Sequence, residues 1–302
     1  MAAMTSLDGE ILHEFPFFRV YKDGRIHLLT PPIEKISPSE DLATGLRSKD
    51  AVISTDPPVH ARIFIPKAAA SDHSCPKLPL LFYLHGGGFC IQSAFSRQHH
   101  GFASIMAAEA GCVVVSVEYG LFPDRPLPGC YDDSWAALEW VAAKQDPWIA
   151  EHADLGRVFV VGNSAGANIS HTLAARIGSV GLPGIKVVGV VLVHPYFGGT
   201  NDDRMWFYMC PSNSGPEDPR LKPAAADLAR LGCERVLVFV AERDHLMEVG
   251  VRYVEKLKKS GWRGAVELVI NEGEGHCFYL SDPTSQDAVQ LKDKLVSFIK
   301  QA

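Results

Sequence analysis

The chain has 302 residues, of which 47% are apolar and 21% charged, and this balance excludes a disordered or fibrous protein. Lysine and arginine total 29 against 35 acidic residues, a formal charge of −6 that argues against a nucleic-acid-binding protein. No apolar run approaches the roughly 18 residues that a membrane helix needs, so we expect no membrane association.

The cysteines and the first residues suggest a compartment. Seven cysteines are scattered singly, and no C-x-x-C pair occurs. The first ten residues, MAAMTSLDGE, are acidic and lack the apolar core of a secretory signal. We therefore expect reduced thiols, no disulfide framework and a cytoplasmic protein.

The segment 1–46 precedes the regular part of the sequence. Within it, Phe17–Tyr21 and Arg25–Leu29 flank a Lys-Asp-Gly turn, which predicts a small hairpin. Two strands follow at Asp50–Ser54 and Val59–Pro66, too close together for a crossover helix between them.

The rest of the chain alternates between two kinds of segment. Continuous apolar runs, typical of strands buried on both faces, occur at Leu80–His85, Val113–Glu118, Arg157–Val161, Val187–His194, Arg235–Ala241 and Ala265–Asn271. Helical stretches are predicted at Phe95–Ala110, Asp132–Ala143, Ala165–Ile177, Val249–Ser260 and Ser285–Lys300. This order predicts a single α/β domain over 1–302. Its sheet is mostly parallel and eight-stranded, with an antiparallel start and helices on both faces.

One region, Tyr196–Pro223, breaks this alternation. It contains a cluster of large apolar residues, Trp206–Met209, among glycines, prolines and acids. A partly helical insertion over a site and a plain surface loop are both open interpretations. Because Phe15, Phe17 and Phe18 also need burial, we expect them to pack on this cluster. The segments 1–46 and about 196–223 would then form a cap.

The pentapeptide Gly162-Asn163-Ser164-Ala165-Gly166 has the form G-x-S-x-G and lies between a predicted buried strand and a predicted helix. This context indicates a sharp turn that lifts the Ser164 hydroxyl above the sheet as a nucleophile. The Ala165 N–H at the helix start can donate to an oxyanion. The alternative is a buried serine in a glycine-rich turn.

A second glycine-rich segment, His85-Gly86-Gly87-Gly88-Phe89, directly follows the strand Leu80–Leu84. Its glycines expose consecutive backbone N–H groups, as an anion-binding loop requires. A phosphate loop is disfavoured because no lysine follows.

A serine nucleophile needs a base and an orienting acid, in the chain order serine, acid, histidine. Of the histidines after Ser164, His276 follows the last strand and is the best base. Asp244 lies just past the strand Arg235–Ala241 and is the preferred acid, with Glu242 as the alternative. We assign no role to His194 and His245.

No ligand spacing predicts a metal site. His99 and His100 are adjacent, so they cannot share a helix face, and we interpret them as solvated histidines. We expect neither a metal nor another cofactor.

These residues together resemble the plant carboxylesterases of the hormone-sensitive-lipase-like group in the α/β-hydrolase superfamily. The resemblance covers nearly the whole chain and runs through His85–Phe89, Pro126–Val141, Gly162–Asn168, Val240–Asp244 and His276. It is strongest to the branch that holds the 2-hydroxyisoflavanone dehydratases and the tuliposide-converting enzymes. The resemblance implies the triad Ser164, Asp244 and His276, the oxyanion donors Gly87, Gly88 and Ala165, and a cap. We also expect the substrate pocket to contain Phe18, Phe89, Phe95, Trp206 and Phe278.

Three positions depart from the family pattern. Asn163 stands where the family usually has aspartate, and Gly120 and Phe122 replace an arginine and an alanine of its E-Y-R-L-A-P segment. Ser164 favours hydrolysis over the dehydratases, which commonly use threonine, and His276 argues against the related hormone receptors, which lose the histidine.

The predicted function is therefore a serine carboxylesterase that hydrolyses small or medium esters, or lactones, through an acyl-enzyme. The alternatives are a dehydratase or lyase acting on a plant metabolite and a hormone-binding receptor. We expect a small-molecule ester as the partner, and a monomer or homodimer.

Overall fold

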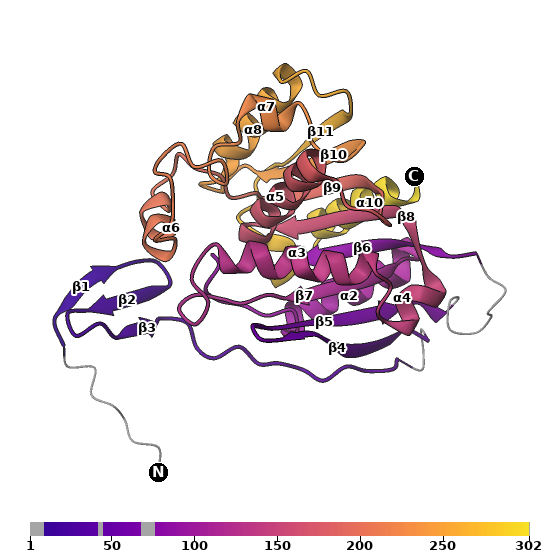
Figure 1. Ribbon diagram of the computed structural model, residues 1–302, viewed down its shortest axis with the longest axis horizontal. Helices are drawn as coiled ribbons and strands as arrows, with labels where there is room; N and C mark the ends of the chain where they lie inside the picture. The colour runs from indigo at the N-terminus through magenta and orange to yellow at the C-terminus, as the bar shows by residue number, and fades with distance from the viewer. Residues whose placement is uncertain (1–8, 42–44, 68–75, 302) are drawn as a thin grey trace, which may run out of the picture.

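The computed structural model describes residues 9–41, 45–67 and 76–301, and its main feature is an eight-stranded sheet (Figure 1). The strand order is β11-β10-β9-β8-β6-β7-β5-β4. Neighbours from β11 to β7 pair in parallel, whereas β5 pairs antiparallel with both β7 and β4. The predicted mostly parallel sheet with an antiparallel start is confirmed. Its strands are β4 (Arg47–Thr55), β5 (Pro58–Ile65), β6 (Leu78–Leu84), β7 (Val113–Glu118), β8 (Ala153–Asn163), β9 (Val187–Val193), β10 (Arg235–Ala241) and β11 (Ala265–Asn271).

Helices cover both faces of this sheet because its strands are apolar on both. In β10, Val236 and Val238 pack into one core, while Leu237 and Phe239 pack into the other. The first core also holds side chains of α3 (Gly129–Ala142), α5 (Ala165–Val180) and α8 (Met247–Lys259). The second holds side chains of α2 (Arg97–Ala110) and α10 (Gln286–Lys300).

A small antiparallel sheet precedes the main one. It consists of β1 (Ile11–Glu14), β2 (Phe18–Tyr21) and β3 (Ile26–Leu28). The predicted hairpin corresponds to β2 and β3, and β1 is an additional strand. Residues 1–8 and 42–44 of the predicted cap segment, and Cys75, lie outside the described residues.

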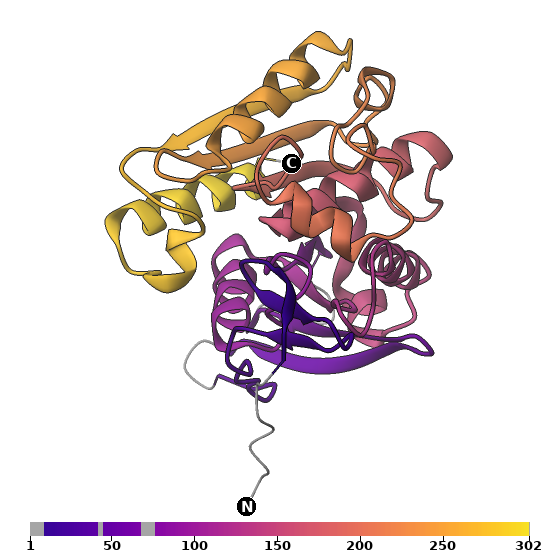
Figure 2. The ribbon, with the colours of Figure 1, turned by 90° about the vertical axis from the view of Figure 1, so that its left-hand side faces the viewer.

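The region from Tyr196 to Pro223 is partly helical, with α6 at Asp203–Met209. Figure 2 shows α6, in orange, beside the indigo β1–β3 sheet on the end of the molecule that faces the viewer. The Tyr208 ring lies 5.2 Å from that of Phe15 and 5.9 Å from that of Phe18, centroid to centroid. The two aromatic segments are therefore in contact.

Three short helices complete the part of the fold that the structure describes: α4 (Pro147–His152), α7 (Ala225–Leu228) and α9 (Phe278–Ser281). No helix in the described part of the chain combines the length and the apolar character that crossing a bilayer requires. All six described cysteines are free thiols.

Candidate active site

Ser164 occupies the sharp turn between β8 and α5. Its backbone has φ 54° and ψ −120°, a conformation that non-glycine residues rarely adopt. The flanking glycines make the turn possible: a Cβ at Gly162 would meet the carbonyl of Gly166, and one at Gly166 would meet the carbonyl oxygen of Leu84. Ser164 Oγ caps no N–H of α5 in the described structure, so the hydroxyl is not used by the helix.

His276 and Asp244 meet above the carboxyl ends of the strands. His276 Nδ1 lies 2.6 Å from Asp244 Oδ2, and the Leu246 N–H donates to Asp244 Oδ1 at 2.9 Å. Burial raises the pKa of the Asp244 carboxyl, but the hydrogen bond and charge of His276, together with the Leu246 N–H, lower it more, so the pKa is lowered. An ionised Asp244 holds the proton on His276 Nδ1 and leaves Nε2 as the acceptor.

The alternative acid, Glu242, lies elsewhere. Its Oε2 accepts the Gly273 N–H at 2.6 Å, and the side chain steadies the loop before the histidine. The structure thus brings Asp244, rather than Glu242, to the imidazole.

The glycine loop after β6 approaches the serine turn closely. A Cβ at Gly86 would lie 2.5 Å from Asn163 Nδ2. Gly87 and Gly88 have φ of 113° and 56°, which favours glycine at both positions. Gly87, Gly88 and Ala165 line one cavity with Ser164, and Ala165 begins α5, where N–H groups have no intrahelical partner.

Asn163 connects three parts of this site. Its Oδ1 accepts hydrogen bonds from the Gly86 N–H and the Tyr83 hydroxyl, both at 3.0 Å. These two donors fix the orientation of the amide, so Nδ2 points to Cys277 Sγ at 3.4 Å. An aspartate here would accept the same two bonds but could not donate to the sulfur.

The cavity above Ser164 has a volume of about 350 Å³, within the range of small-molecule sites. Phe89 and Trp206 line it, as the sequence predicts, and Phe17 lines it as well. The Phe17 ring covers Gly88: a Cβ on that glycine would lie 2.5 Å from Phe17 Cε2. The N-terminal segment and α6 therefore both contribute walls.

Three predicted pocket residues do not line this cavity. Phe18 is fully buried, with its ring 5.0 Å from that of Phe122. Phe95 instead faces the cations of Lys35 and Arg62. The Phe278 ring stacks on His194 at 5.9 Å. Each of these side chains contacts other residues instead of lining the cavity, so these three expectations are corrected.

Two histidines that the sequence left without a role hold the site together. His194 Nδ1 accepts the Cys277 N–H at 2.8 Å and so anchors the residue next to His276. His245 lines the cavity, and its Nε2 lies 2.7 Å from Asp202 Oδ2. Both roles depend on contacts between segments distant in sequence.

His99 is buried, contrary to the expectation of a solvated side chain, whereas His100 is partly exposed. His99 is 1% exposed, and its Nδ1 lies 2.8 Å from the Tyr83 hydroxyl. His100 Nδ1 lies 3.0 Å from Arg62 Nη1.

The remaining departures also have structural counterparts. Arg125 occupies the space above Gly120 and binds Asp133, with Nη2 3.0 Å from Oδ1. Phe122 joins the aromatic contact between the N-terminal segment and α6, with its ring 5.0 Å from that of Phe18 and 6.0 Å from that of Tyr208.

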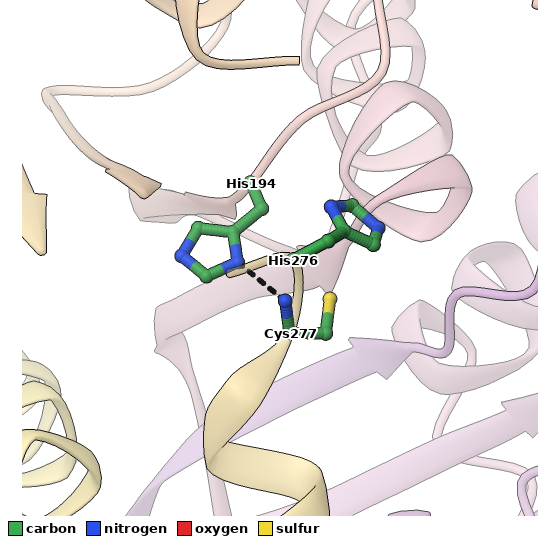
Figure 3. A group of neighbouring side chains, drawn as sticks. All are labelled: His194, His276 and Cys277. Atoms are coloured by element: carbon green, nitrogen blue, oxygen red, sulfur yellow. Dashed lines mark hydrogen bonds between the residues drawn. The ribbon is translucent and has the colours of Figure 1, made fainter. Parts of the chain in front are cut away.

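One group of side chains has the donor atoms of a metal site. Ligand atoms of His194, His276 and Cys277 lie within 4.8 Å of one another. Figure 3 shows the three side chains. The sequence did not predict this group because His194 lies far along the chain from His276 and Cys277. Holding a metal there would use the same histidine that bonds Asp244.

Comparison with known proteins extends these observations. Residues 81–280 match a family model described as the alpha/beta hydrolase fold, and this range includes the glycine loop, the serine turn and His276. The chain is 39% identical to 2-hydroxyisoflavanone dehydratase of Glycyrrhiza echinata over 325 residues, covering 98% of both chains. It is 40% identical to probable carboxylesterase 3 of Arabidopsis thaliana over 311 residues, covering 95% of this chain and 97% of the relative.

Solved structures agree with the sequence relatives. An esterase from Pyrobaculum calidifontis superimposes with a TM-score of 0.70 at 29% identity, covering 84% of this chain and 85% of that one.

Proposed function

This chain belongs to the alpha/beta hydrolase fold family, and we propose that it is a serine carboxylesterase whose nucleophile is Ser164. The observation that carries the proposal is the 2.6 Å contact between His276 Nδ1 and Asp244 Oδ2, beside a cavity that Ser164 also lines. Relatives named as carboxylesterases and a similar esterase structure support hydrolysis of carboxylic esters.

The mechanism follows from these contacts. Ser164 Oγ attacks the ester carbonyl while His276 Nε2 takes its proton, and Asp244 stabilises the imidazolium that forms. The backbone N–H groups of Gly87, Gly88 and Ala165 are the proposed donors to the oxyanion. His276 then protonates the leaving alcohol and activates the water that releases the acid.

The cavity favours an uncharged substrate. Among the described residues that line it there is no lysine or arginine, while Asp202 contributes a carboxylate. An anionic ester would therefore be desolvated with no cation to pair with. Apolar residues such as Phe17, Phe89 and Met205 dominate the wall, so we propose neutral esters of small or medium size.

Single substitutions test the assignment. Ser164→Ala, Asp244→Asn and His276→Ala should each lower kcat for a short p-nitrophenyl ester by about 10³-fold or more. Ser179→Ala, at the exposed far end of α5, is the matched control and should keep the rate. Full activity in Ser164→Ala would reject the nucleophile.

A dehydratase is the second candidate, favoured by the 39% identical relative that carries this name. Incubating the same enzyme with a 2-hydroxyisoflavanone distinguishes the two. Rapid elimination of water from that compound, with slow ester hydrolysis, would favour the dehydratase.

We propose the cytoplasm as the location, since scattered free cysteines suit a reducing compartment. A fluorescent fusion of the full chain in plant cells tests this, and signal confined to an organelle would contradict it.

Light scattering on the purified protein would distinguish the proposed monomer or homodimer from larger assemblies.

A further inference from the structure

Cys277 lies among groups that favour a negatively charged sulfur. Its Sγ accepts from Asn163 Nδ2 at 3.4 Å, and ring nitrogens of His276 and His194 lie within 4.8 Å of it. Figure 3 shows the His276 ring beside the sulfur, and His194 bonded to the backbone nitrogen of the same cysteine. An amide donor and neighbouring imidazoles are the surroundings that activate a thiol.

The charge balance agrees with this geometry. Burial raises the pKa of the Cys277 thiol, but the charges and hydrogen bonds of His276 and His194 lower it more, and the net shift is downward. Burial raises the pKa of Cys90 and of Cys112 to about 12, and it also raises the pKa of Cys233.

Cys277 also differs from the other described cysteines in its access to the cavity. Of the six that the structure describes, Cys277 alone lines the cavity above Ser164. A small neutral molecule that enters the cavity by the route of an ester substrate would therefore reach the Cys277 sulfur. Cys233 is also partly exposed but lies outside the cavity, so it provides a matched comparison.

We propose that Cys277 is a reactive thiol that adds to α,β-unsaturated carbonyl compounds entering the cavity, and that the adduct stops catalysis at Ser164. The thiol proton passes to His276 Nε2, and the sulfur electron pair forms a C–S bond at the β-carbon. The C=C π pair moves toward the carbonyl as an enolate, which takes the proton back from His276 at its α-carbon. The sum is thiol plus alkene giving thioether, with no oxidant or reductant.

The inhibitory part of this inference rests on the proposed esterase function, whereas the addition itself does not. An adduct on Cys277 would occupy part of a cavity of about 350 Å³ and stand next to the general base. It would also replace the sulfur contact of Asn163, whose other bonds hold the glycine loop.

Binding of a soft metal ion is the competing use of the same atoms. His194 Nδ1, however, already accepts the Cys277 N–H at 2.8 Å, so its lone pair is engaged. The cluster is therefore better suited to proton transfer between Cys277 and His276 than to three-ligand coordination.

N-ethylmaleimide on the full-length protein tests the proposal, in a Cys75→Ser background because Cys75 lies outside the described residues. Peptide mapping should find Cys277 modified at least about tenfold faster than Cys233. Esterase activity, as a fraction of its starting value, should fall in step with Cys277 modification. Equal or slower labelling of Cys277 would overturn the proposal, as would full labelling with unchanged activity.

Three variants sharpen the test. Cys277→Ser should abolish the loss of esterase activity caused by N-ethylmaleimide, whereas Cys233→Ser should leave that loss unchanged. Asn163→Asp replaces the amide donor with a carboxylate and should slow the labelling of Cys277. Faster or unchanged labelling in that variant would contradict the proposed activation, even if Cys277→Ser failed to fold.

Ser164→Ala separates this inference from the proposed function. It should still label at Cys277, because the addition does not use the serine. Labelling without esterase activity in the wild type would reject the esterase and keep the reactive thiol. Esterase activity without preferred labelling would do the reverse. Inhibition by Zn²⁺ that EDTA reverses, without preferred labelling by the maleimide, would assign the cluster to metal binding instead.

Discussion

The Nε2 atom of His245 lies 2.7 Å from Asp202 Oδ2, and this contact joins the loop after β10 to the segment that enters α6. His245 is the neighbour of Asp244, and its Nδ1 lies 3.4 Å from Asp244 Oδ1. A residue adjoining the proposed catalytic acid is thus tied to a wall of the cavity.

Breaking the contact between His245 and Asp202 should weaken substrate binding more than it slows the chemical step. A hydrogen bond within a protein contributes about 0.5–1.5 kcal/mol, so Asp202→Asn should raise KM by about tenfold or less, with a smaller change in kcat. Glu217→Gln is the control, since its pair with Lys222 belongs to the same region but lies outside the cavity. Steady-state kinetics on a medium-chain ester measure both. A larger fall in kcat than rise in KM would argue that the pair orients Asp244 instead.

Phe17 should set the preference for substrate size. Its ring covers Gly88, so Phe17→Ala should raise KM for larger esters and have less effect on acetates, which depend mainly on the triad. The expected loss in kcat/KM for larger esters is up to about tenfold, because the ring is only partly buried. Leu12→Ala, at a side chain that is 52% exposed in the same segment, is the control.

Deleting residues 1–30 extends this test and should give the same selectivity in stronger form. Equal handling of large and small esters by the shortened chain would show that the segment is passive.

The pH dependence of hydrolysis should report a base with a raised pKa. Burial lowers the pKa of His276, but the Cys277 sulfur and the Asp244 carboxylate raise it more, so it lies above the ordinary 6.5. Hydrolysis needs the neutral ring, and kcat/KM should therefore continue to rise above pH 6.5. Cys277→Ser removes the negative sulfur and should shift this rise in kcat/KM to lower pH, whereas Cys233→Ser should not. An unchanged pH dependence of kcat/KM in Cys277→Ser would contradict the claim that Cys277 raises the pKa of His276.

The glycines of the serine turn should be irreplaceable. Gly166→Ala would place a Cβ against the carbonyl oxygens of Leu84 and His85, so we expect a loss of about 1–3 kcal/mol in the free energy of unfolding. Gly101 lies within α2, and a Cβ there would meet no atom within 4 Å. Gly101→Ala should therefore stabilise the protein by about 0.5–1 kcal/mol. Urea unfolding measures both, and equal effects would refute the steric argument.

The regular sheet was predictable because burial on both faces leaves a plain signal. All seven residues of β9 are buried, and the sequence Val187–Val193 is correspondingly apolar throughout. β1 gave no such signal: Ile11 and Leu12 are exposed, and a bulge interrupts its pairing with β2. The six residues of α4 are too few for a helical period to appear.

The candidate site likewise has some parts that the sequence predicts and others that it does not. Ser164, Asp244 and His276 could be predicted to lie together because each follows a strand, and parallel strands bring those ends together. Whether Phe17 or Phe18 faces the cavity was not predictable, since it depends on how the β1–β3 sheet docks against α6. The roles of His194 and Asn163 likewise depend on Cys277, which is far from both in sequence.

The amide of Asn163 makes positions 163 and 277 depend on each other. With an aspartate at 163, Cys277 would lie against a carboxylate and would lose the only donor that residue 163 offers its sulfur. A serine at 277 would remove the negative sulfur from this contact. Asn163→Asp alone should therefore be less tolerated than Asn163→Asp combined with Cys277→Ser.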